Sequence, residues 1–426
     1  MILGCSDARV PVAPSSNVVP ARLMERVRCS TTKPGDRGGL RRGAKATGTA
    51  PRERACPRSR CRMESGMLQR KVLCSLALFA FVTSAGVVCA SAARGATIAG
   101  QDALAAATTW SEVKQLPGGS DFWPVLPQFN LGLEAGPLPV AEAVQLYDYV
   151  GPDAERAGAE IDSTVVVLGN SAQAQAAYAR YSRVDDRGRT IAGPRVDASQ
   201  WRYSRKTSGK LTELTLRWRI GQAVGRVALI DRKPWTASTL AGLFRPVSQR
   251  TRALLAGHLH APALSAPEAA LLPSSRAAPW RVVGTTSVPA AAWAVEDSSH
   301  NPQQTLRTLQ RDGLGTLLTR TYRPGNVPQN DVSVVLFRFA SPSGASSWVQ
   351  SFINDAKRKG GLHPGLTGKR SAFEEGSKGS YFELQFARGP FVGDVFCAAP
   401  FGKTSSACEG ITRRLAERWY SALPHR

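Results

Sequence analysis

An internal repeat at an offset of about 170 residues is the feature that most constrains the fold of this chain. "STVVVLGNSAQAQAAYARYSR" from Ser163 and "VSVVLFRFASPSGASSWVQSFI" from Val332 each combine a β-rich run with an amphipathic helix pattern. Further along, "LTELTLRWRIGQAVGRVAL" from Leu211 corresponds to "YFELQFARGPFVGDVFCAA" from Tyr381. Unless two generic segments align by chance, such a chain builds the same small unit twice.

Both later segments alternate apolar and polar residues, as antiparallel strands with one buried face do. The alignment pairs Glu213 with Glu383 and, after a length difference of two residues at the turn, Arg226 with Asp394. A helix pattern follows each hairpin, and "LPVAEAVQLYDYV" from Leu138 is also expected to be helical. We therefore predict the α+β class, with two copies of an antiparallel sheet that has helices packed on one face.

The repeat also predicts the domain boundaries. The first α+β unit is expected at residues 93–257 and the second at residues 281–426. Residues 258–280 are rich in Ala, Pro and Ser and are expected to be a linker. If the two units pack together, the cleft between them is a common kind of ligand site.

Residues 63–92 have the pattern of a signal peptide or a signal anchor. An Arg-Lys pair precedes the uncharged run 72–90, which would be about 28 Å long as a helix. A small-x-small pattern then predicts cleavage between Ala92 and Ala93. The rest of the chain is therefore expected to be secreted or extracytoplasmic, and membrane-anchored by residues 72–90 if the signal is retained.

Residues 1–62 have no apolar periodicity and hold fourteen Lys or Arg against four Asp or Glu. They are either a disordered cytoplasmic tail or a mis-assigned leader, with translation starting at Met63 or Met67. Subtracting the net charges of residues 1–62 and 63–92, about +10 and +1, from +23 leaves about +12 for the remainder. This moderate basic charge suits contact with an anionic polymer, although a solvated basic surface is the alternative.

The cysteines agree with an oxidising compartment. Only Cys397 and Cys408 follow the signal-like segment, and they bracket "CAAPFGKTSSAC" between a strand and a helix. A disulfide between them is the favoured interpretation, and a reactive thiol at the start of the helix is the alternative.

The signal-like start, the V-V-L helix entries and the hairpins "ARGPFVGDVF" and "WRIGQAVGRVAL" together resemble a group of exported proteins of high-GC bacteria. This group contains extracytoplasmic sensor-type domains, among them those of actinobacterial Ser/Thr kinases, and related small lipoproteins. The resemblance implies a duplicated domain with a binding or sensing role outside the membrane. It implies no catalytic residue.

No motif predicts a catalytic residue, a cofactor or a metal ion. His258-x-His260 lies in the expected linker without a nearby Cys, Asp or Glu, and "GLTGKRS" lacks the glycines of a phosphate loop. We therefore expect an exported, envelope-associated binding or sensor-type protein rather than an enzyme. The alternative is an exported hydrolase acting on cell-envelope material, which would need His, Ser or carboxylate side chains from separate segments to meet in a pocket. His300 or His363 beside a carboxylate would favour this alternative.

Four charged residues near the two hairpin turns are candidates for contact with a ligand or an anion: Arg219, Arg226, Arg388 and Asp394. Charges on the solvent face of an edge hairpin are the alternative. The expected partner is a small molecule of unknown identity or an anionic envelope polymer, with membrane contact only through the N-terminal segment. Nucleic acid is not expected, because no run of Lys and Arg alternates with aromatic residues in the manner of a strand-binding groove.

Overall fold

The computed structural model describes residues 98–129, 139–184, 188–296, 301–323, 332–359, 362–375, 381–398 and 406–425. The leader, the signal-like segment and the cleavage site at Ala92 and Ala93 lie outside these residues. Contacts between Cα atoms place residues 96–426 in one compact unit.

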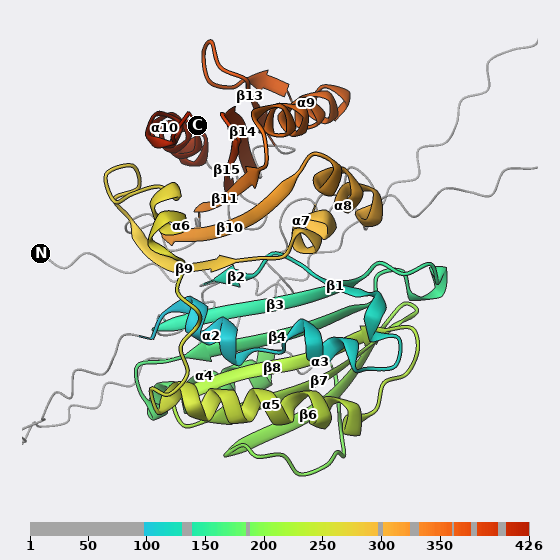
Figure 1. Cartoon of the computed structure of the whole chain (residues 1–426). Helices are drawn as coiled ribbons and strands as arrows, with labels where there is room; N and C mark the ends of the chain where they lie inside the picture. The colour runs from blue at the N-terminus through green and yellow to red at the C-terminus, as the bar shows by residue number, and fades with distance from the viewer. Residues whose placement is uncertain are drawn as a thin grey trace, which may run out of the picture. The chain divides into compact units, whose positions relative to one another are not determined.

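The first sheet is antiparallel and has the strand order β1-β3-β4-β8-β7-β6-β5, with β2 paired to β3 (Figure 1). Its strands are β1 (Phe122–Pro124), β2 (Gln128–Phe129), β3 (Ala141–Tyr149), β4 (Glu160–Val167), β5 (Arg189–Ile191), β6 (Gln200–Ser208), β7 (Leu211–Ile220) and β8 (Ala223–Asp231). The helices of this part are α2 (Gly100–Ala106), α3 (Trp110–Lys114), α4 (Ser171–Val184) and α5 (Ala237–Leu255), with single 3-10 turns at Gly119–Asp121 and Ala154–Arg156.

The second sheet is also antiparallel and has the order β12-β13-β14-β15-β11-β10-β9. Its strands are β9 (Arg281–Ser287), β10 (Leu314–Arg323), β11 (Val332–Phe339), β12 (Leu362–Pro364), β13 (Ser371–Glu375), β14 (Tyr381–Arg388) and β15 (Phe391–Ala398). The helices are α6 (Ala266–Leu271), α7 (Ala290–Glu296), α8 (Pro302–Arg311), α9 (Pro342–Lys359) and α10 (Ser406–Ala422).

The two sheets have the same strand order, which confirms the α+β class with two sheet copies. β1, β3, β4, β8, β7, β6 and β5 of the first copy match β9, β10, β11, β15, β14, β13 and β12 of the second. In each copy one helix follows the third of these strands, and a second helix follows the fourth.

Strand register corrects the alignment of the hairpins. Trp218 lies opposite Gly225 on β7–β8, and Phe386 lies opposite Gly393 on β14–β15. Two residues connect the strands in each hairpin, so the two turns have the same length. Glu383 is therefore the counterpart of Thr215 rather than Glu213.

The same register changes one of the two predicted correspondences near the turns. Asp394 corresponds to Arg226, as the sequence alignment indicated. Arg388 is the counterpart of Ile220, and the counterpart of Arg219 is Ala387. Arg219 and Arg388 are thus not equivalent positions.

One expected helix is a strand. The segment from Leu138 forms β3, and its pattern of burial extends over both faces of the strand. A strand that is buried on both sides has a nearly continuous apolar run, which periodicity alone does not distinguish from a buried helix.

Helices pack on both faces of each sheet, which refines the expected one-sided arrangement. In the first copy α5 covers Leu216 and Trp218, whereas α4 covers Val166 and Val224 on the opposite face. In the second copy α9 and α10 lie on opposite sides of the strands (Figure 1). The central strands, β4 and β11, are accordingly buried on both faces over most of their length.

The segment 258–280 connects the two copies, but it is not a free linker. It contains α6, and Leu272 is buried in the core of the second copy. The carbonyl oxygen of Pro273 accepts a hydrogen bond from the hydroxyl of Tyr322 at 2.9 Å, and that of Leu271 accepts one from Trp419 Nε1 at 2.7 Å. Apolar residues among the prolines hold this segment against the sheet.

Cys397 on β15 and Cys408 on α10 form a disulfide, with a Cα–Cα distance of 5.5 Å. Both residues are fully buried. The bridge fixes the start of α10 to the strand that it follows, and this is the pairing that the sequence favoured.

Candidate functional site

The predicted contact residues of the first copy have protein partners. Arg219, on β7, donates from Nε to Gln200 Oε1 at 2.9 Å and from Nη1 to Ser171 Oγ at 3.1 Å. Arg226, on β8, donates to the carboxylate of Asp162 on the neighbouring strand β4. Both arginines lie on the face that α4 covers, where they connect strands to each other and to the helix.

The predicted contact residues of the second copy are likewise engaged. Arg388 donates to the carbonyl oxygen of Tyr420, and its guanidinium lies 4.9 Å from the centre of the Tyr420 ring. Asp394 accepts a hydrogen bond from Gln385 Nε2 at 3.3 Å. Arg388 therefore fastens α10 to β14, and the four candidates do not converge on one site.

Sequence reasoning missed four further arginines: Arg189, Arg202, Arg205 and Arg217. Arg202 and Arg217 are direct cross-strand neighbours on β6 and β7, and together with Arg226 on β8 they form what we call the arginine row. The signal for the row was the alternation in "WRY" and "RWR", since every second residue of a strand shares a face. Arg205 lies on the opposite face of β6, and Arg189 lies opposite it on β5.

The arginine row is largely a structural layer beneath α4. Arg217 donates from Nη1 to Ser204 Oγ at 2.9 Å and is itself buried. Burial also raises the pKa of Tyr178 on α4, although the positive charges of Arg202 and Arg217 act in the opposite direction. Only Arg202 reaches the edge of the sheet, where Nε and Nη2 donate to Thr190 Oγ1 on β5 at 3.0 and 2.6 Å.

Carboxylates gather at the other end of this face. Glu160 and Asp148 are cross-strand neighbours on β4 and β3, and Asp162 follows on the same face of β4. Desolvation and then the charges of Asp148 and Asp162 raise the pKa of Glu160 to about 8. The residue is only partly covered, but its Oε1 is enclosed without a hydrogen-bond partner among the described residues.

A surface pocket of about 420 Å³ lies at the edge of the first sheet, on β5 and β6. Its apolar lining comes from Ile191 and Ala192. Its polar lining comes from two arginines and two threonines: Arg189, Arg205, Thr190 and Thr207. Its volume falls within the range of small-ligand sites. We call it the edge pocket.

Arg189 and Arg205 lie directly opposite each other on β5 and β6. Both side chains are exposed, and in the part of the chain that the structure describes neither guanidinium has a hydrogen-bond or ion-pair partner. Like charges at directly opposed positions of an antiparallel pair are destabilising. An anion bound between them would remove that repulsion and accept hydrogen bonds from the planar forks of both guanidinium groups.

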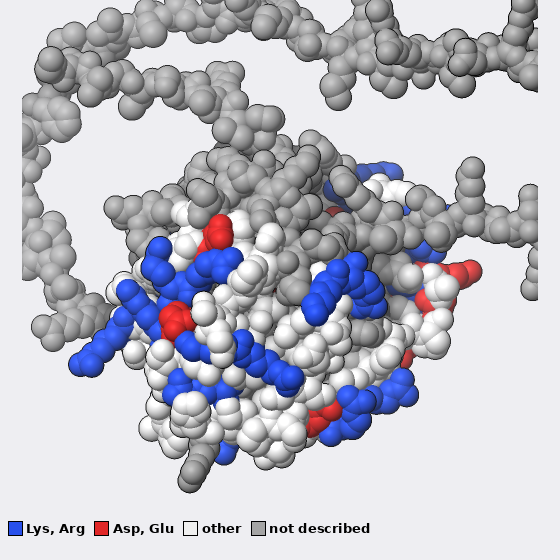
Figure 2. Space-filling model, turned by 90° about the horizontal axis from the view of Figure 1, so that it is seen from above, with Lys and Arg blue, Asp and Glu red and all other residues white. Residues whose placement is uncertain are grey.

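The edge pocket is linked to the arginine row through Thr190. The guanidinium of Arg202 donates to the hydroxyl oxygen of Thr190, so the hydroxyl hydrogen of Thr190 can still donate to another group. Donors therefore dominate this corner of the sheet. Basic side chains are also spread over the other end of the molecule, which Figure 2 shows from above, with few acidic groups among them.

The chemistry that the edge pocket offers is hydrogen bonding and charge pairing from its two arginines. Among the residues that the structure describes, no group of three or more His, Cys, Asp and Glu is placed to hold a metal ion. His363 lies on β12 and makes an edge contact with the ring of Phe373 at a centroid distance of 6.0 Å. His300, the other histidine that a hydrolase could use, is outside the described residues.

In the described ranges, no helix has the length and apolar character that a membrane span requires. The expected anchor, residues 72–90, lies outside those ranges.

Comparison with known proteins finds similarity only at the level of solved structures. Neither a protein family model nor a curated protein matches the chain. The chain is similar to the extracellular domain of PknH from Mycobacterium tuberculosis, with 14% sequence identity and a TM-score of 0.24. The matched part covers 36% of this chain and 94% of that domain. At this level of similarity, the match carries no conclusion about ligand or mechanism.

Proposed function

We propose that the protein is an exported binding module that recognises an anionic group in the edge pocket of its first copy. The supporting observation is the opposed pair Arg189 and Arg205, which line the pocket and lack partners within the described residues. Phosphate and carboxylate groups match the guanidinium fork, so they are the expected part of the ligand.

A structural explanation of this arginine pair is weaker than a binding one. Charged residues on edge strands discourage pairing with other sheets, but one charge on either strand would serve that purpose. Two opposed arginines add a repulsion, and the threonine hydroxyls beside them add further polar lining. The cluster is therefore better suited to receive an anion than to protect an edge.

Equilibrium dialysis of the full chain against radiolabelled inorganic phosphate, at constant ionic strength, tests this proposal. Wild-type protein should bind phosphate weakly, and Arg189→Ala and Arg205→Ala should each reduce binding at least tenfold, since a charge-assisted contact is lost. Arg232→Ala is the matched control, because Arg232 is exposed and does not line the pocket. Equal binding by all four proteins, or no binding by wild type, would contradict the proposal.

A further inference from the structure

Trp201 is an exposed tryptophan on the same strand face as Arg205. It is 37% exposed, and Val282 is the other large apolar residue exposed in the described part of the chain. Four other tryptophans, Trp218, Trp293, Trp348 and Trp419, are buried. An indole that remains at the surface of a sheet is available as a stacking platform.

The position of Trp201 follows from strand register. It lies opposite Trp218, which packs on Phe244 of α5, so the indole of Trp201 points to the α5 face. Arg205 lies opposite Leu214, a core residue of the same face, and so points to the same side. Four residues of extended chain separate the two positions by about 13 Å.

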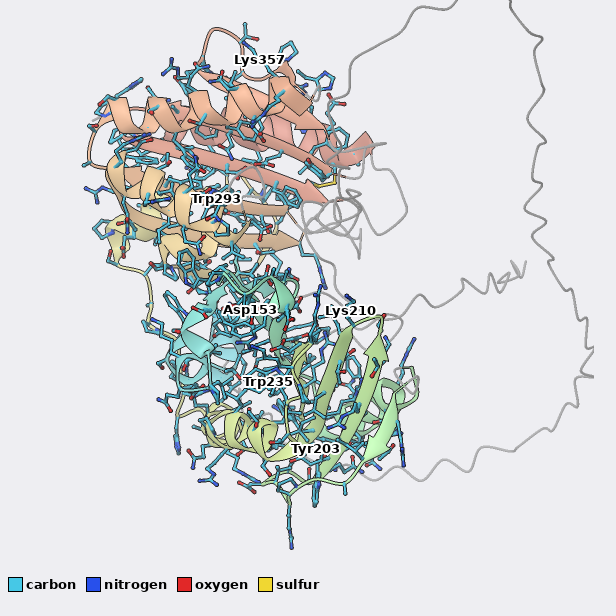
Figure 3. The ribbon with its side chains drawn as sticks, turned by 90° about the vertical axis from the view of Figure 1, so that its right-hand side faces the viewer. Asp153, Tyr203, Lys210, Trp235, Trp293 and Lys357 are labelled. Atoms are coloured by element: carbon cyan, nitrogen blue, oxygen red, sulfur yellow. A yellow bond between two sulfur atoms is a disulfide. The ribbon has the colours of Figure 1, made fainter. Side chains whose placement is uncertain are left out.

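Tyr203 and the loop segment that covers it lie between Trp201 and the edge pocket. Tyr203, labelled in Figure 3, occupies the intervening position on β6, and its hydroxyl donates to the carbonyl oxygen of Pro194 at 3.1 Å. A Cβ atom on Gly193 would lie only 2.6 Å from the Tyr203 ring, so the glycine lets this segment lie flat on the ring. Ala192 and Gly193, at the pocket end of this segment, are exposed and small.

We infer that the edge pocket and Trp201 together bind an anionic polysaccharide, with a carboxylate or phosphate at the arginine pair and a sugar ring on the indole. The inference rests on the proposed anion site. The separation of about 13 Å is too long for a compact anion, so a ligand that touches both ends must be extended. Thr207, on the same face of β6 as Trp201 and Arg205, would offer its hydroxyl to the sugar hydroxyls.

The polysaccharide fits these features better than the other anionic polymers. A pyranose ring has a face of C–H groups that packs on an indole, and its hydroxyls need polar partners of the kind that threonine supplies. A single-stranded nucleic acid would use several aromatic platforms in succession, and β6 exposes one. A single indole combined with an arginine pair therefore favours a charged glycan.

Fluorescence titration of the full chain with a linear oligogalacturonate tests the inference, with a neutral dextran oligomer as the uncharged probe. Trp201→Ala should weaken oligogalacturonate binding about tenfold, by analogy with the loss of one stacking platform, and leave phosphate binding unchanged. Trp201→Phe should retain most of the affinity, because it keeps an aromatic face. Arg205→Ala should abolish binding of both oligogalacturonate and phosphate.

Two results would overturn the inference while leaving the anion site intact. One is unchanged oligogalacturonate affinity in Trp201→Ala together with loss of phosphate binding in Arg205→Ala. The other is tighter binding of single-stranded oligothymidylate than of oligogalacturonate at equal charge. If neither Arg189→Ala nor Arg205→Ala loses phosphate binding, the proposed function itself is contradicted. Failure of the polysaccharide inference and failure of the proposed function therefore give different results.

Discussion

The two copies share one strand order but differ in the chemistry of equivalent positions. The arginine row of the first copy is Arg202, Arg217 and Arg226, and strand register places Ala372, Gln385 and Asp394 at the same positions of the second. Apolar positions, in contrast, keep their character, as Trp218 and Phe386 do. The buried apolar positions maintain the same fold in both copies, whereas equivalent polar positions of the two sheets carry different side chains.

The outer strands differ in a second way. Phe373 in the second copy is the counterpart of Tyr203, and the guanidinium of Arg413 from α10 lies 3.9 Å from its ring centre. Arg413 also donates to the carbonyl oxygen of Pro364 at 2.9 Å, which ties edge strand β12 to the helix. In the first copy a loop segment covers Tyr203 instead, and the edge pocket lies beside it. The edge strand is thus fastened to a helix by Arg413 in the second copy, whereas the edge pocket lies at the equivalent edge of the first.

The largest expected effect comes from breaking a buried ion pair of the first copy. Arg156 donates from Nε and Nη2 to Asp231 Oδ2 at 3.0 and 2.7 Å, and Asp231 is fully buried. The guanidinium also lies within 5.7 Å of the Trp235 ring centre, in the region labelled in Figure 3. Arg156→Ala should lower the free energy of unfolding by about 3–5 kcal/mol, because it leaves a buried carboxylate uncompensated. Urea denaturation of the full chain measures this change.

The exposed pair Lys233–Asp153 is the matched control for that prediction. Its side chains are well solvated, so Lys233→Ala should leave the urea denaturation midpoint nearly unchanged. Equal losses in the two variants would show that burial does not distinguish these pairs.

The next largest expected effect is the loss of stability when the disulfide, which only the second copy has, is removed. Cys397 corresponds by register to Leu229, so the first copy has no bridge at this position. The double variant Cys397→Ala/Cys408→Ala should lose about 2–3 kcal/mol of stability, mostly because the unfolded chain is no longer restricted. Hydrogen exchange should become faster in β15 and α10. A uniform change over both copies would contradict a local role for the disulfide.

The equivalent glycines test the duplication itself. A Cβ on Gly225 would meet the carbonyl oxygen of Thr164 at 2.1 Å and the Trp218 ring at 2.4 Å, and one on Gly393 would meet the Phe386 ring at 2.3 Å. Both alanine variants should therefore be destabilised by about 1–3 kcal/mol. Gly225→Ala should be the worse of the two, since the carbonyl oxygen belongs to the backbone and yields less than a ring. Thermal unfolding would reveal whether this order is reversed.

The smallest expected effect is a pH dependence confined to the first copy. The raised pKa of Glu160, about 8, means that the folded state holds a proton which the unfolded chain releases at lower pH. Stability from this group is present below its unfolded pKa and is lost as the pH rises through about 8. Asp148, Asp162 and Glu213 favour the protonated form, and Arg226 opposes it.

Glu160→Gln should flatten this dependence, since the amide carries no titrating proton. Denaturant midpoints measured from pH 5 to pH 9 provide the test, with Glu155→Gln, an exposed position, as the control. A wild-type stability that rises over this range would contradict the assigned sign.

The sequence allowed the duplication, the α+β class and the disulfide to be predicted, because each depends on local patterns that recur along the chain. It did not allow β3 to be recognised, since burial of Val144 and Tyr147 on opposite faces hides the strand periodicity. The edge pocket was not predictable either. β5 has three residues, and Arg189 meets Arg205 only because tertiary pairing brings together positions far apart in the chain.

The difference between the copies is tested most directly by the backbone amide shifts of the full chain on addition of inorganic phosphate at constant ionic strength. The account predicts shifts at residues 188–192 and 203–207, and none at residues 362–364 and 371–375 of the equivalent strands in the second copy. Shifts in the second copy, or in neither, would contradict the claim that the duplicated fold carries its anion site at one edge only.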